Sequence, residues 1–574
     1  MYSFKEVKKA AKNQIEGRAI KLAVLGNCAT QFLSTAIEGY AKLEGLNLNV
    51  FDADYNQIDA QLFDTDSEVY AFNPDEIVLF LSTDKLYEEF LDKPIEKRKY
   101  FADEILMKLG QYWNLISINS KARIIQPNFT EIDDKALGNY SAKVEYTFIY
   151  QIRKLNYLLE EAAKNKNNVY PLDLLSVQIS LGQKVFYDPS LYYNAKMTIS
   201  MDALPYVAKT VIDVLKAMEG KIKKCVILDL DNTLWGGVIG DDGLGGIQIG
   251  ELKAGHVYSD FQRWLKQLKE FGTILAVCSK NNEDTAKEPF EKHDEMILRL
   301  SDISVFVANW NDKASNIKLI QESLNIGMDS IVFIDDNPFE RNLVKSMIPE
   351  IEVPDLPENP AEYLSFLQSL NLFDTASFAG TNADRTNQYQ AEFERKKSQM
   401  TYASIDDYLK SLEMIGEAKP FEEVRFARIA QLTQRSNQFN LRTIRYTEDE
   451  IEKIANDKNY ITLYYTLKDK FGDHGLIAVV IMKKVSAEEV FVDTWLMSCR
   501  VLKRGMEEFI VNKMVKTAKE QGYKKVLAEY IPTAKNSMVK DIYKTMGFDE
   551  YEENKYSLNI EEFTAKENFI SEEE

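Results

Sequence analysis

The chain has 574 residues, of which 45% are hydrophobic and 28% are charged, and its formal net charge is −20. Because one domain usually holds about 100–200 residues, this length predicts three domains. The negative charge argues against a general affinity for nucleic acid or for an anionic membrane. The four cysteines are widely separated, so we expect no structural disulfides. The first segment is polar, and the apolar runs are much shorter than the ~20 residues of a membrane span. These features favour a cytoplasmic protein.

Residues 1–220 alternate apolar runs of strand length with helical stretches, and the runs lie at 20–25, 48–51 and 76–81. This alternation predicts a parallel α/β layer. The first run ends in Gly26-Asn27-Cys28, which resembles the nucleophile block of SGNH-type esterases with Cys28 in the place of serine. No histidine precedes His256, so a Cys–His relay within this segment is excluded. We expect a non-hydrolytic domain, with Cys28 as one possible thiol relay.

Residues 221–370 contain four near-continuous apolar runs, at 226–230, 273–278, 304–307 and 331–334, and each ends in polar residues. Such runs are typical of strands that are buried on both faces of a parallel sheet. A glycine-rich, hairpin-like stretch at 235–250 follows the first run, where a large inserted cap domain is absent. So small a flap favours an open site and a bulky or protein-tethered substrate.

Acidic and polar residues gather where these four strands end. Asp229 and Asp231 close the first run, and Asp335 and Asp336 follow the fourth. Ser279 follows the second strand, and Lys313 begins the helix after the third. Since ligands of parallel sheets bind at the carboxyl ends of the strands, we expect these groups to meet. Hard oxygen donors of this kind suit Mg²⁺.

The order of these residues, DxDx[TV]…[ST]…K…DD, resembles the haloacid dehalogenase (HAD) superfamily of phosphoryl-transfer enzymes. The resemblance implies that Asp229 attacks phosphorus and that Asp231 protonates the leaving oxygen and later deprotonates water. It also implies two sets of ligands. Mg²⁺ would be held by Asp229, the Asp231 carbonyl and Asp335, with or without Asp336. The phosphoryl oxygens would be held by Ser279, Lys313 and the N–H groups near Asn232 and Thr233.

Longer strings resemble the FkbH-like branch of that superfamily, namely DLDNTLWGGVIGDDG, LAVCSKNNE, NWNDKASNI, FIDDNPFER and RIAQLTQRSNQFNL. Members of this branch take a phosphorylated three-carbon acyl donor of the bisphosphoglycerate type, remove its phosphates and load the glyceryl group onto an acyl carrier protein. The resemblance therefore implies a phosphorylated small-molecule donor and a carrier protein as partners. Strand spacing alone indicates only phosphoryl transfer.

Residues 371–411 are interpreted as a connector, 412–560 as a third domain and 561–574 as an acidic, disordered tail. In the third domain, strands are predicted at 461–467, 476–482, 490–496 and 525–530, and helices at 505–521 and 536–546. This order resembles the α+β fold of GNAT acyltransferases. The expected fold class is thus α/β with three domains: SGNH-like, HAD-like and GNAT-like.

The segment from Arg500 to Gly505 resembles the GNAT phosphate-binding loop, with Lys503 where a small residue is usual. The resemblance implies that Arg500, Lys503, Arg504 and Gly505 bind the pyrophosphate of CoA or the phosphate of carrier-bound phosphopantetheine. Asn536 and Tyr543 complete the expected site. Tyr543 is a candidate acid for the leaving thiol, but packing is an equal alternative. Cys499 is either a thioester relay or a small buried side chain.

The sequence leaves three readings open. The leading one is removal of phosphate from an acyl donor coupled to acyl transfer onto a carrier protein. The second is an HAD phosphomonoesterase fused to an independent N-acyltransferase that acts on a sugar or a small metabolite. The third is a scaffold protein with decayed sites, against which the complete central motif argues.

Overall fold

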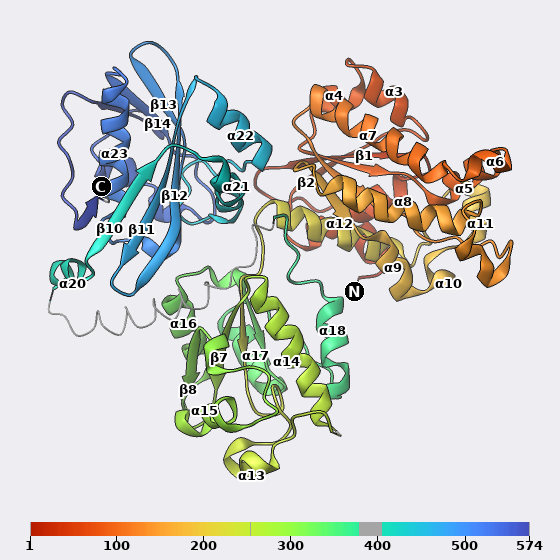
Figure 1. Ribbon diagram of the computed structural model, residues 1–574, viewed down its shortest axis with the longest axis horizontal. Helices are drawn as coiled ribbons and strands as arrows, with labels where there is room; N and C mark the ends of the chain where they lie inside the picture. The colour runs from red at the N-terminus through yellow and green to blue at the C-terminus, as the bar shows by residue number, and fades with distance from the viewer. Residues whose placement is uncertain (1, 253, 378–403, 573–574) are drawn as a thin grey trace. The chain divides into compact units, whose positions relative to one another are not determined.

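The computed structural model describes residues 2–252, 254–377 and 404–572 (Figure 1). The chain divides into two compact units, Met1–Ala217 and Met218–Glu574. Three separate sheets organise it, one of five strands in the first unit and sheets of four and eight strands in the second. The predicted multidomain α/β class is therefore confirmed. In the part of the chain that is described, no helix is both long and apolar enough to cross a bilayer.

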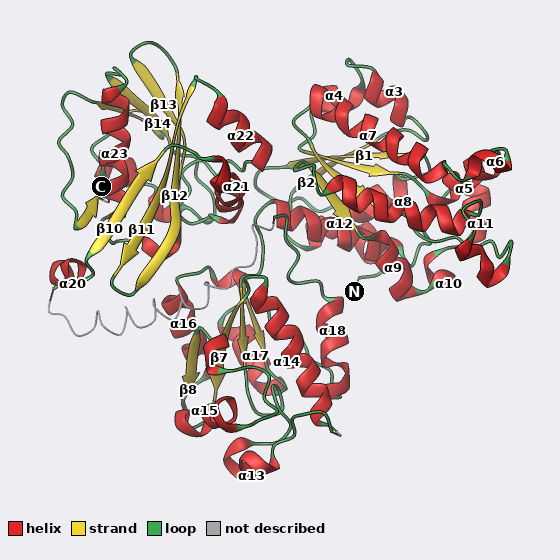
Figure 2. Cartoon of the chain, in the orientation of Figure 1, coloured by secondary structure: helices red, strands yellow, loops and turns green. Residues whose placement is uncertain are grey.

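The first unit is built on a parallel sheet with the strand order β2-β1-β3-β4-β5. Apolar residues fill β1 and β3 almost continuously, so helices cover both faces of the sheet (Figure 2). The strands are β1 Ile20–Gly26, β2 Leu48–Asp52, β3 Glu76–Phe80, β4 Arg123–Pro127 and β5 Val169–Leu172. The helices are α1 Phe4–Ala10, α2 Gln31–Leu43, α3 Ile58–Phe63, α4 Glu68–Phe72, α5 Thr83–Leu91, α6 Ile95–Arg98, α7 Phe101–Asn119, α8 Phe148–Ala163, α9 Leu174–Leu181, α10 Gln183–Phe186, α11 Pro189–Ala195 and α12 Leu204–Met218.

The four-stranded sheet is also parallel, in the order β8-β7-β6-β9, so the first and last of its four strands in the sequence, β6 and β9, lie side by side. Every residue of β6, β7 and β9 is buried. The strands are β6 Cys225–Leu228, β7 Ile274–Ser279, β8 Val305–Ala308 and β9 Ile331–Ile334. The helices are α13 Ile239–Gly246, α14 Gly255–Glu270, α15 Glu283–Lys292, α16 Lys313–Leu324, α17 Pro338–Met347 and α18 Tyr363–Ser369.

The flap after β6 differs from the expected hairpin. A backbone bridge between Gly236 and Gln248 closes its base, and the short helix α13 fills the loop. Gly243 interrupts this helix, because its positive φ of 67° is not helical. Glycine adopts such a φ readily, since it has no Cβ.

The eight-stranded sheet is mixed, with the order β15-β16-β14-β13-β12-β11-β10-β17. Strands β10 to β13 are antiparallel neighbours, whereas β13 and β14 are parallel and need the helix between them as a crossover. The strands are β10 Met414–Lys419, β11 Tyr460–Asp469, β12 Gly472–Lys484, β13 Glu489–Met497, β14 Lys525–Glu529, β15 Asp549–Glu552, β16 Lys555–Asn559 and β17 Ile570–Glu572. The helices are α20 Ile405–Ser411, α21 Phe426–Arg435, α22 Glu448–Asn456, α23 Met506–Glu520 and α24 Ile542–Thr545.

Two expectations for this region are wrong. The helix predicted at 536–546 shrinks to a 3₁₀ turn, Ser537–Val539, and the four residues of α24, since the Asn536 side chain binds the backbone before the helix can start. The tail is not disordered within its described residues: β17 pairs with the edge strand β10, and Ile570 joins the core. Most of the predicted connector, 378–403, lies outside the described residues.

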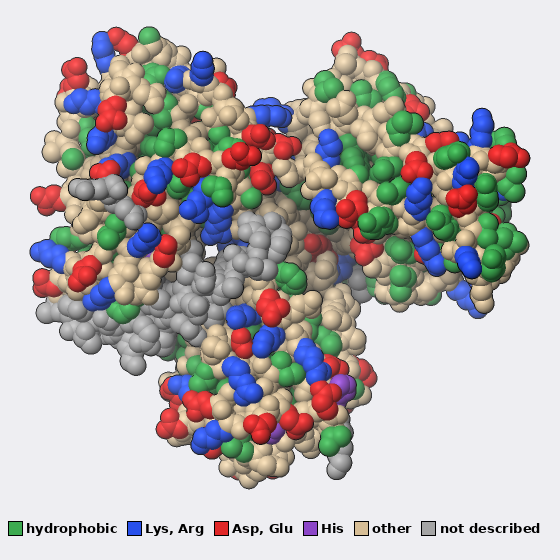
Figure 3. All heavy atoms as spheres, in the orientation of Figure 1, with side chains coloured by type: hydrophobic (Ala, Val, Ile, Leu, Met, Phe, Trp, Pro, Cys, Tyr) green, Lys and Arg blue, Asp and Glu red, His purple; other side chains and the backbone are tan. Residues whose placement is uncertain are grey.

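Lysine and arginine side chains lie among aspartate and glutamate side chains over the face of the molecule seen in Figure 3. Positive charge is therefore mixed with negative charge on this face rather than gathered into one field.

Candidate active site

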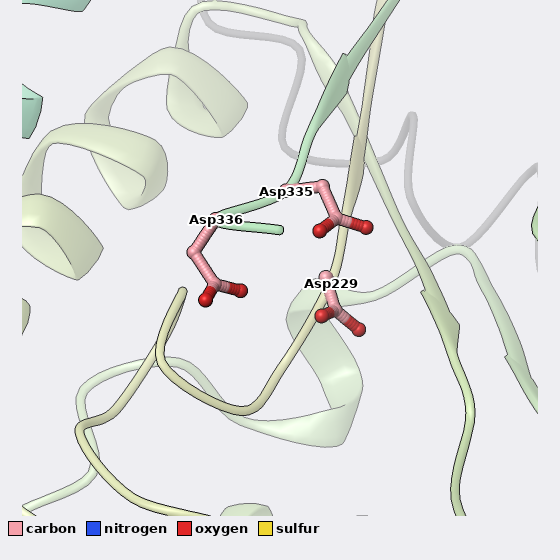
Figure 4. A group of neighbouring side chains, drawn as sticks. All are labelled: Asp229, Asp335 and Asp336. Carbon is pink, nitrogen blue, oxygen red and sulfur yellow. The ribbon is translucent and has the colours of Figure 1, made fainter. Parts of the chain in front are cut away.

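The four-stranded sheet brings three carboxylates together at the carboxyl ends of its strands. Asp229 follows β6, and its N–H donates to the Ile334 carbonyl at 3.0 Å, so the ladder between β6 and β9 continues to the site. Asp335 and Asp336 follow β9 directly. Carboxylate oxygens of all three residues lie within 4.8 Å of one another, and Figure 4 shows the three side chains as neighbours. The predicted convergence of the two strand ends is thus found.

Lys313 places an ammonium group among these acids. Its Nζ lies 3.0 Å from Oδ2 of Asp229 and 2.5 Å from Oδ2 of Asp335. Burial opposes charge on Lys313, but the two carboxylates outweigh it and raise the pKa of the ammonium group. Burial, together with the negative charge of Asp229, raises the pKa of Asp335 well above the usual carboxyl range. The same causes raise the pKa of Asp336.

This donor set fits a divalent cation. Three carboxylates face one ammonium group, so the ionised site would carry two uncompensated negative charges among buried residues. Burial first, and then the negative charge of Asp229, raise the pKa values of Asp335 and Asp336, so both carboxylates are costly to ionise without a cation. One divalent cation would neutralise the excess, and oxygen ligands of this type suit Mg²⁺.

Two residues that the motif does not include hold these acids in place. Arg341 is 6% exposed, and its Nη1 donates to the carbonyls of Asp335 at 2.9 Å and Asp336 at 2.6 Å. The Asn337 N–H donates to Oδ1 of Asp335 at 2.8 Å. Both residues follow Asp336 within the string FIDDNPFER, but nothing local in the sequence shows that Arg341 turns back to the strand end.

The phosphate ligands expected near Asn232 and Thr233 are engaged elsewhere. The Asn232 N–H donates to the Gly237 carbonyl and the Thr233 N–H to the Leu230 carbonyl. The Thr233 hydroxyl donates to Oδ1 of Asp336 at 3.2 Å and accepts the Asp336 N–H at 3.1 Å. Thr233 therefore orients a carboxylate in this structure, and its N–H and that of Asn232 are not presented to a ligand.

Ser279 lies at the end of β7 and is 2% exposed. Among the described residues, none forms a hydrogen bond with its hydroxyl. The hydroxyl therefore has no protein partner that would compete with a phosphoryl oxygen, and a phosphate-binding role for Ser279 stays a prediction.

Asp231 is surrounded by donors that sequence reasoning missed. Oδ1 accepts the Trp235 indole N–H and the Ile239 backbone N–H, both at 2.9 Å, and Oδ2 accepts the Asn281 side-chain N–H at 2.8 Å. The DLDNTLW string contains Trp235, but it does not reveal the direction of the indole. Asn281 comes from the loop after β7, so only the fold brings it to Asp231.

The binding loop expected at residues 500–505 is not formed as predicted. Gly505, with φ of 83°, is the N-cap of α23, but a Cβ there would lie 3.2 Å from Asn568 of the tail. Arg504 is 6% exposed, with Nη1 3.3 Å from Nε2 of His474 and 3.6 Å from Oδ2 of Asp469. Lys503 donates its backbone N–H to Glu507. Arg500 lies in the turn Cys499–Val501, and its side chain is not described.

Asn536 and Tyr543 serve the core of the third domain. Asn536 is fully buried and bonds the Asn440 and Ile531 carbonyls, the Thr533 N–H and the Tyr530 hydroxyl. Tyr543 is also fully buried, among Trp495, Phe548 and Tyr556. Burial raises the pKa of its hydroxyl. These contacts match the packing alternative for Tyr543 rather than a role as an acid.

The gap between β13 and β14 is filled by the chain itself. Pairing of the two strands stops at Val492 and Ala528. Beyond that point the segment 439–441 bonds Trp495 and Met497 of β13 on one side and Ile531 on the other. Its residues are at most 2% exposed. Open strand edges can bind an extended ligand by backbone pairing, but here the segment occupies both.

The cysteines differ in their surroundings. Cys28 is 3% exposed near Thr198, and burial raises the pKa of its thiol to about 12, which disfavours the reactive thiolate. Burial likewise raises the pKa of Cys225 and Cys278. Cys499 is half-buried, and a thioester role for it stays a prediction. All four cysteines are free thiols.

Comparison with known proteins agrees with this architecture. Residues 21–216 match the model of the FkbH N-terminal domain. The crystal structure of the N-terminal part of BF1531 from Bacteroides fragilis, described as containing a phosphatase domain complexed with Mg, is 46% identical with a TM-score of 0.63. The match covers 66% of this chain and 100% of that one. Among curated proteins none matches.

Acetyltransferase structures also show a weak likeness. One is the ribosomal-protein-S18-alanine N-acetyltransferase from Escherichia coli, 14% identical with a TM-score of 0.21, which covers 27% of this chain and 98% of that one. Another is the GNAT domain of S. lividans PAT, 17% identical with a TM-score of 0.20, which covers 25% and 89%. At these scores the likeness adds nothing to the topology already described.

The four-stranded parallel sheet carries acidic residues at its strand ends, and the Bacteroides relative contains a phosphatase domain. The chain is therefore an enzyme with an HAD-type phosphatase domain. Within that class, the chain belongs to the FkbH family.

Proposed function

We propose that the chain is a magnesium-dependent phosphoryl-transfer enzyme that delivers an acyl group to an acyl carrier protein. The observation that carries the first half is the convergence of Asp229, Asp335 and Asp336 around Lys313. The Mg bound to the Bacteroides relative supports the choice of metal. The second half rests on the family relationship. A cytoplasmic location, expected from the free cysteines, belongs to the same proposal.

In this proposal, each step of phosphoryl transfer is assigned to particular residues. Asp229 attacks phosphorus and forms an aspartyl phosphate while the P–O bond to the leaving group breaks. Asp231 gives that oxygen a proton and later takes one from the water that releases phosphate. Ser279 and Lys313 hold the phosphoryl oxygens. Asp229, the Asp231 carbonyl, Asp335 and Asp336 would hold Mg²⁺, which would supply positive charge to offset repulsion between Asp229 and the phosphate.

The donor in this proposal is a small three-carbon acid that carries both an ester phosphate and an acyl phosphate. The ester phosphate passes to Asp229 and then to water. The acyl phosphate leaves when the carrier's thiol attacks the acyl carbon and loses its proton, so a thioester forms. CoA is not required, because the phosphate itself activates the acyl group. The filled gap between β13 and β14 disfavours the alternative of an independent CoA-dependent N-acyltransferase.

One experiment tests both halves. The full chain is incubated with Mg²⁺, a bisphosphoglycerate-type donor and a phosphopantetheinylated carrier, and both released phosphate and carrier mass are measured. We expect phosphate and a carrier heavier by one glyceryl group. Asp229→Asn should lower Mg²⁺-dependent phosphate release at least about 10³-fold. Asp294→Asn, an exposed change in the same domain, is the control.

The two readouts separate the outcomes. Phosphate without a heavier carrier would remove the acyl-transfer half and leave a phosphatase. Undiminished release by Asp229→Asn would overturn the phosphoryl-transfer mechanism.

A further inference from the structure

We infer that Trp235 and Asn281 are positioning residues for the acid–base group of the site, and that they leave Oδ2 of Asp231 to exchange the proton. This inference rests on the proposed function, since it assigns partners to the carboxylate that serves the leaving group. It concerns a side chain that the metal cluster does not include.

Lone-pair counting identifies the oxygen. An ionised carboxylate has about four acceptor positions, two on each oxygen. The Trp235 and Ile239 N–H groups occupy both positions on Oδ1, and Asn281 occupies one on Oδ2. One position on Oδ2 remains. When the P–O bond to the leaving group breaks, a proton on that oxygen passes to the leaving oxygen. The same position receives the proton of the attacking water in the second step.

The donors are held firmly enough to fix the carboxylate. Trp235 is completely buried, and its ring meets Phe290 of α15 edge-to-face at 5.9 Å. Phe290 in turn packs against Phe306 of β8 at 5.6 Å. Asn281 is 5% exposed and lies in the loop directly after β7. The indole thus connects the orientation of Asp231 to the packed side of the sheet.

The third donor connects the same carboxylate to the flap. Ile239 is the first residue of α13, and its N–H is one of the two bonds to Oδ1. The flap is closed at its base by reciprocal backbone bonds between Gly236 and Gln248, at 3.0 and 2.7 Å. Asp231 is therefore oriented by Asn281 from the loop after β7 and by Trp235 and Ile239 from the flap.

The inference predicts a loss that depends on the leaving group. Proton donation matters greatly for an alkyl phosphate, whose alkoxide leaves poorly, and little for acetyl phosphate, whose carboxylate leaves without a proton. Trp235→Phe keeps the aromatic packing but removes the N–H. We expect kcat/KM, which reports the steps up to the aspartyl phosphate, to fall roughly 10- to 100-fold for the alkyl phosphate and no more than about twofold for acetyl phosphate.

A second variant and a control variant complete the test. Asn281→Ala should show the same selective loss, which keeps the inference testable if Trp235→Phe does not fold. Trp264→Phe is the matched control, because Trp264 packs against Phe261 and Phe373 and bonds no residue of the site. An equal fall for both substrates in the two variants would overturn the inference. Failure of the unaltered protein to hydrolyse either substrate would instead overturn the proposed function.

Discussion

At the scale of single residues, the site is defined by negative charge held close together out of water. Asp229, Asp335 and Asp336 approach within 4.8 Å, and Lys313 compensates one charge only. Burying like charges is costly, so the metal-free protein raises the pKa of Asp335. Repulsion among these carboxylates destabilises the metal-free folded protein, and the same repulsion favours the binding of a cation.

This balance predicts how stability depends on pH and metal. A carboxyl group whose pKa is raised by folding binds more protons in the folded than in the unfolded chain, so metal-free stability should fall as the pH rises above the usual carboxyl range. Mg²⁺ competes with those protons, so its stabilisation should grow from about pH 5.5 to about pH 7.5 and reach about 2.7 kcal/mol at 100 times its dissociation constant. Thermal unfolding with and without Mg²⁺ measures both effects.

Asp335→Asn separates the two contributions. Without Mg²⁺ the variant should unfold at the same or a higher temperature than the unaltered protein, because one buried negative charge is gone. Added Mg²⁺ should no longer raise that temperature. A Mg²⁺ shift as large as that of the unaltered protein would contradict the assignment of Asp335 as a ligand.

At the scale of elements, the third domain depends on a short segment between two diverging strands. Residues 439–441 bond β13 and Ile531, and the Asn536 side chain holds the Asn440 carbonyl at 2.9 Å. Arg442 adds ion pairs with Asp493 at 3.0 Å and Glu529 at 2.9 Å. The segment therefore closes the sheet where parallel pairing ends.

Asn536→Ala should loosen the attachment of residues 439–441 to the strands on either side. The change leaves the Asn440 and Ile531 carbonyls and the Thr533 N–H without a side-chain partner, at a cost of roughly 1–3 kcal/mol per buried group. Hydrogen exchange followed by mass spectrometry should show faster exchange at residues 436–441 and 528–536. Asn456→Ala, which removes one bond at an exposed site, is the control. Unchanged protection of both segments would show that Asn536 does not hold the closure.

At the scale of the whole molecule, the sequence predicted what local patterns determine. Apolar runs predicted the buried strands of two parallel sheets, and acids placed at strand ends predicted the cluster around Asp229. Contacts between distant segments could not be read in this way. Neither the turn of Arg341 back to the strand end nor the approach of Asn281 to Asp231 has a local signal.

In the third domain, too, contacts between residues far apart in the sequence could not be predicted. The loop pattern at 500–505 is present, but Arg504 pairs with His474 and Asp469, and the tail lies against Gly505. Composition suggested that the acidic tail would be disordered, yet the open edge of β10 gave it a partner. A motif therefore predicted the local backbone here, whereas its chemistry depended on what the rest of the fold placed beside it.

In the proposed mechanism, Asp229 is the residue that receives the phosphoryl group. The full chain can be mixed with Mg²⁺ and acetyl phosphate, quenched in acid and digested, and the phosphorylated peptide identified by mass spectrometry. We expect one phosphoryl group on the peptide that contains Asp229, none without Mg²⁺, and none in Asp229→Asn. A phosphoryl group on another residue, or its persistence in Asp229→Asn, would contradict the account.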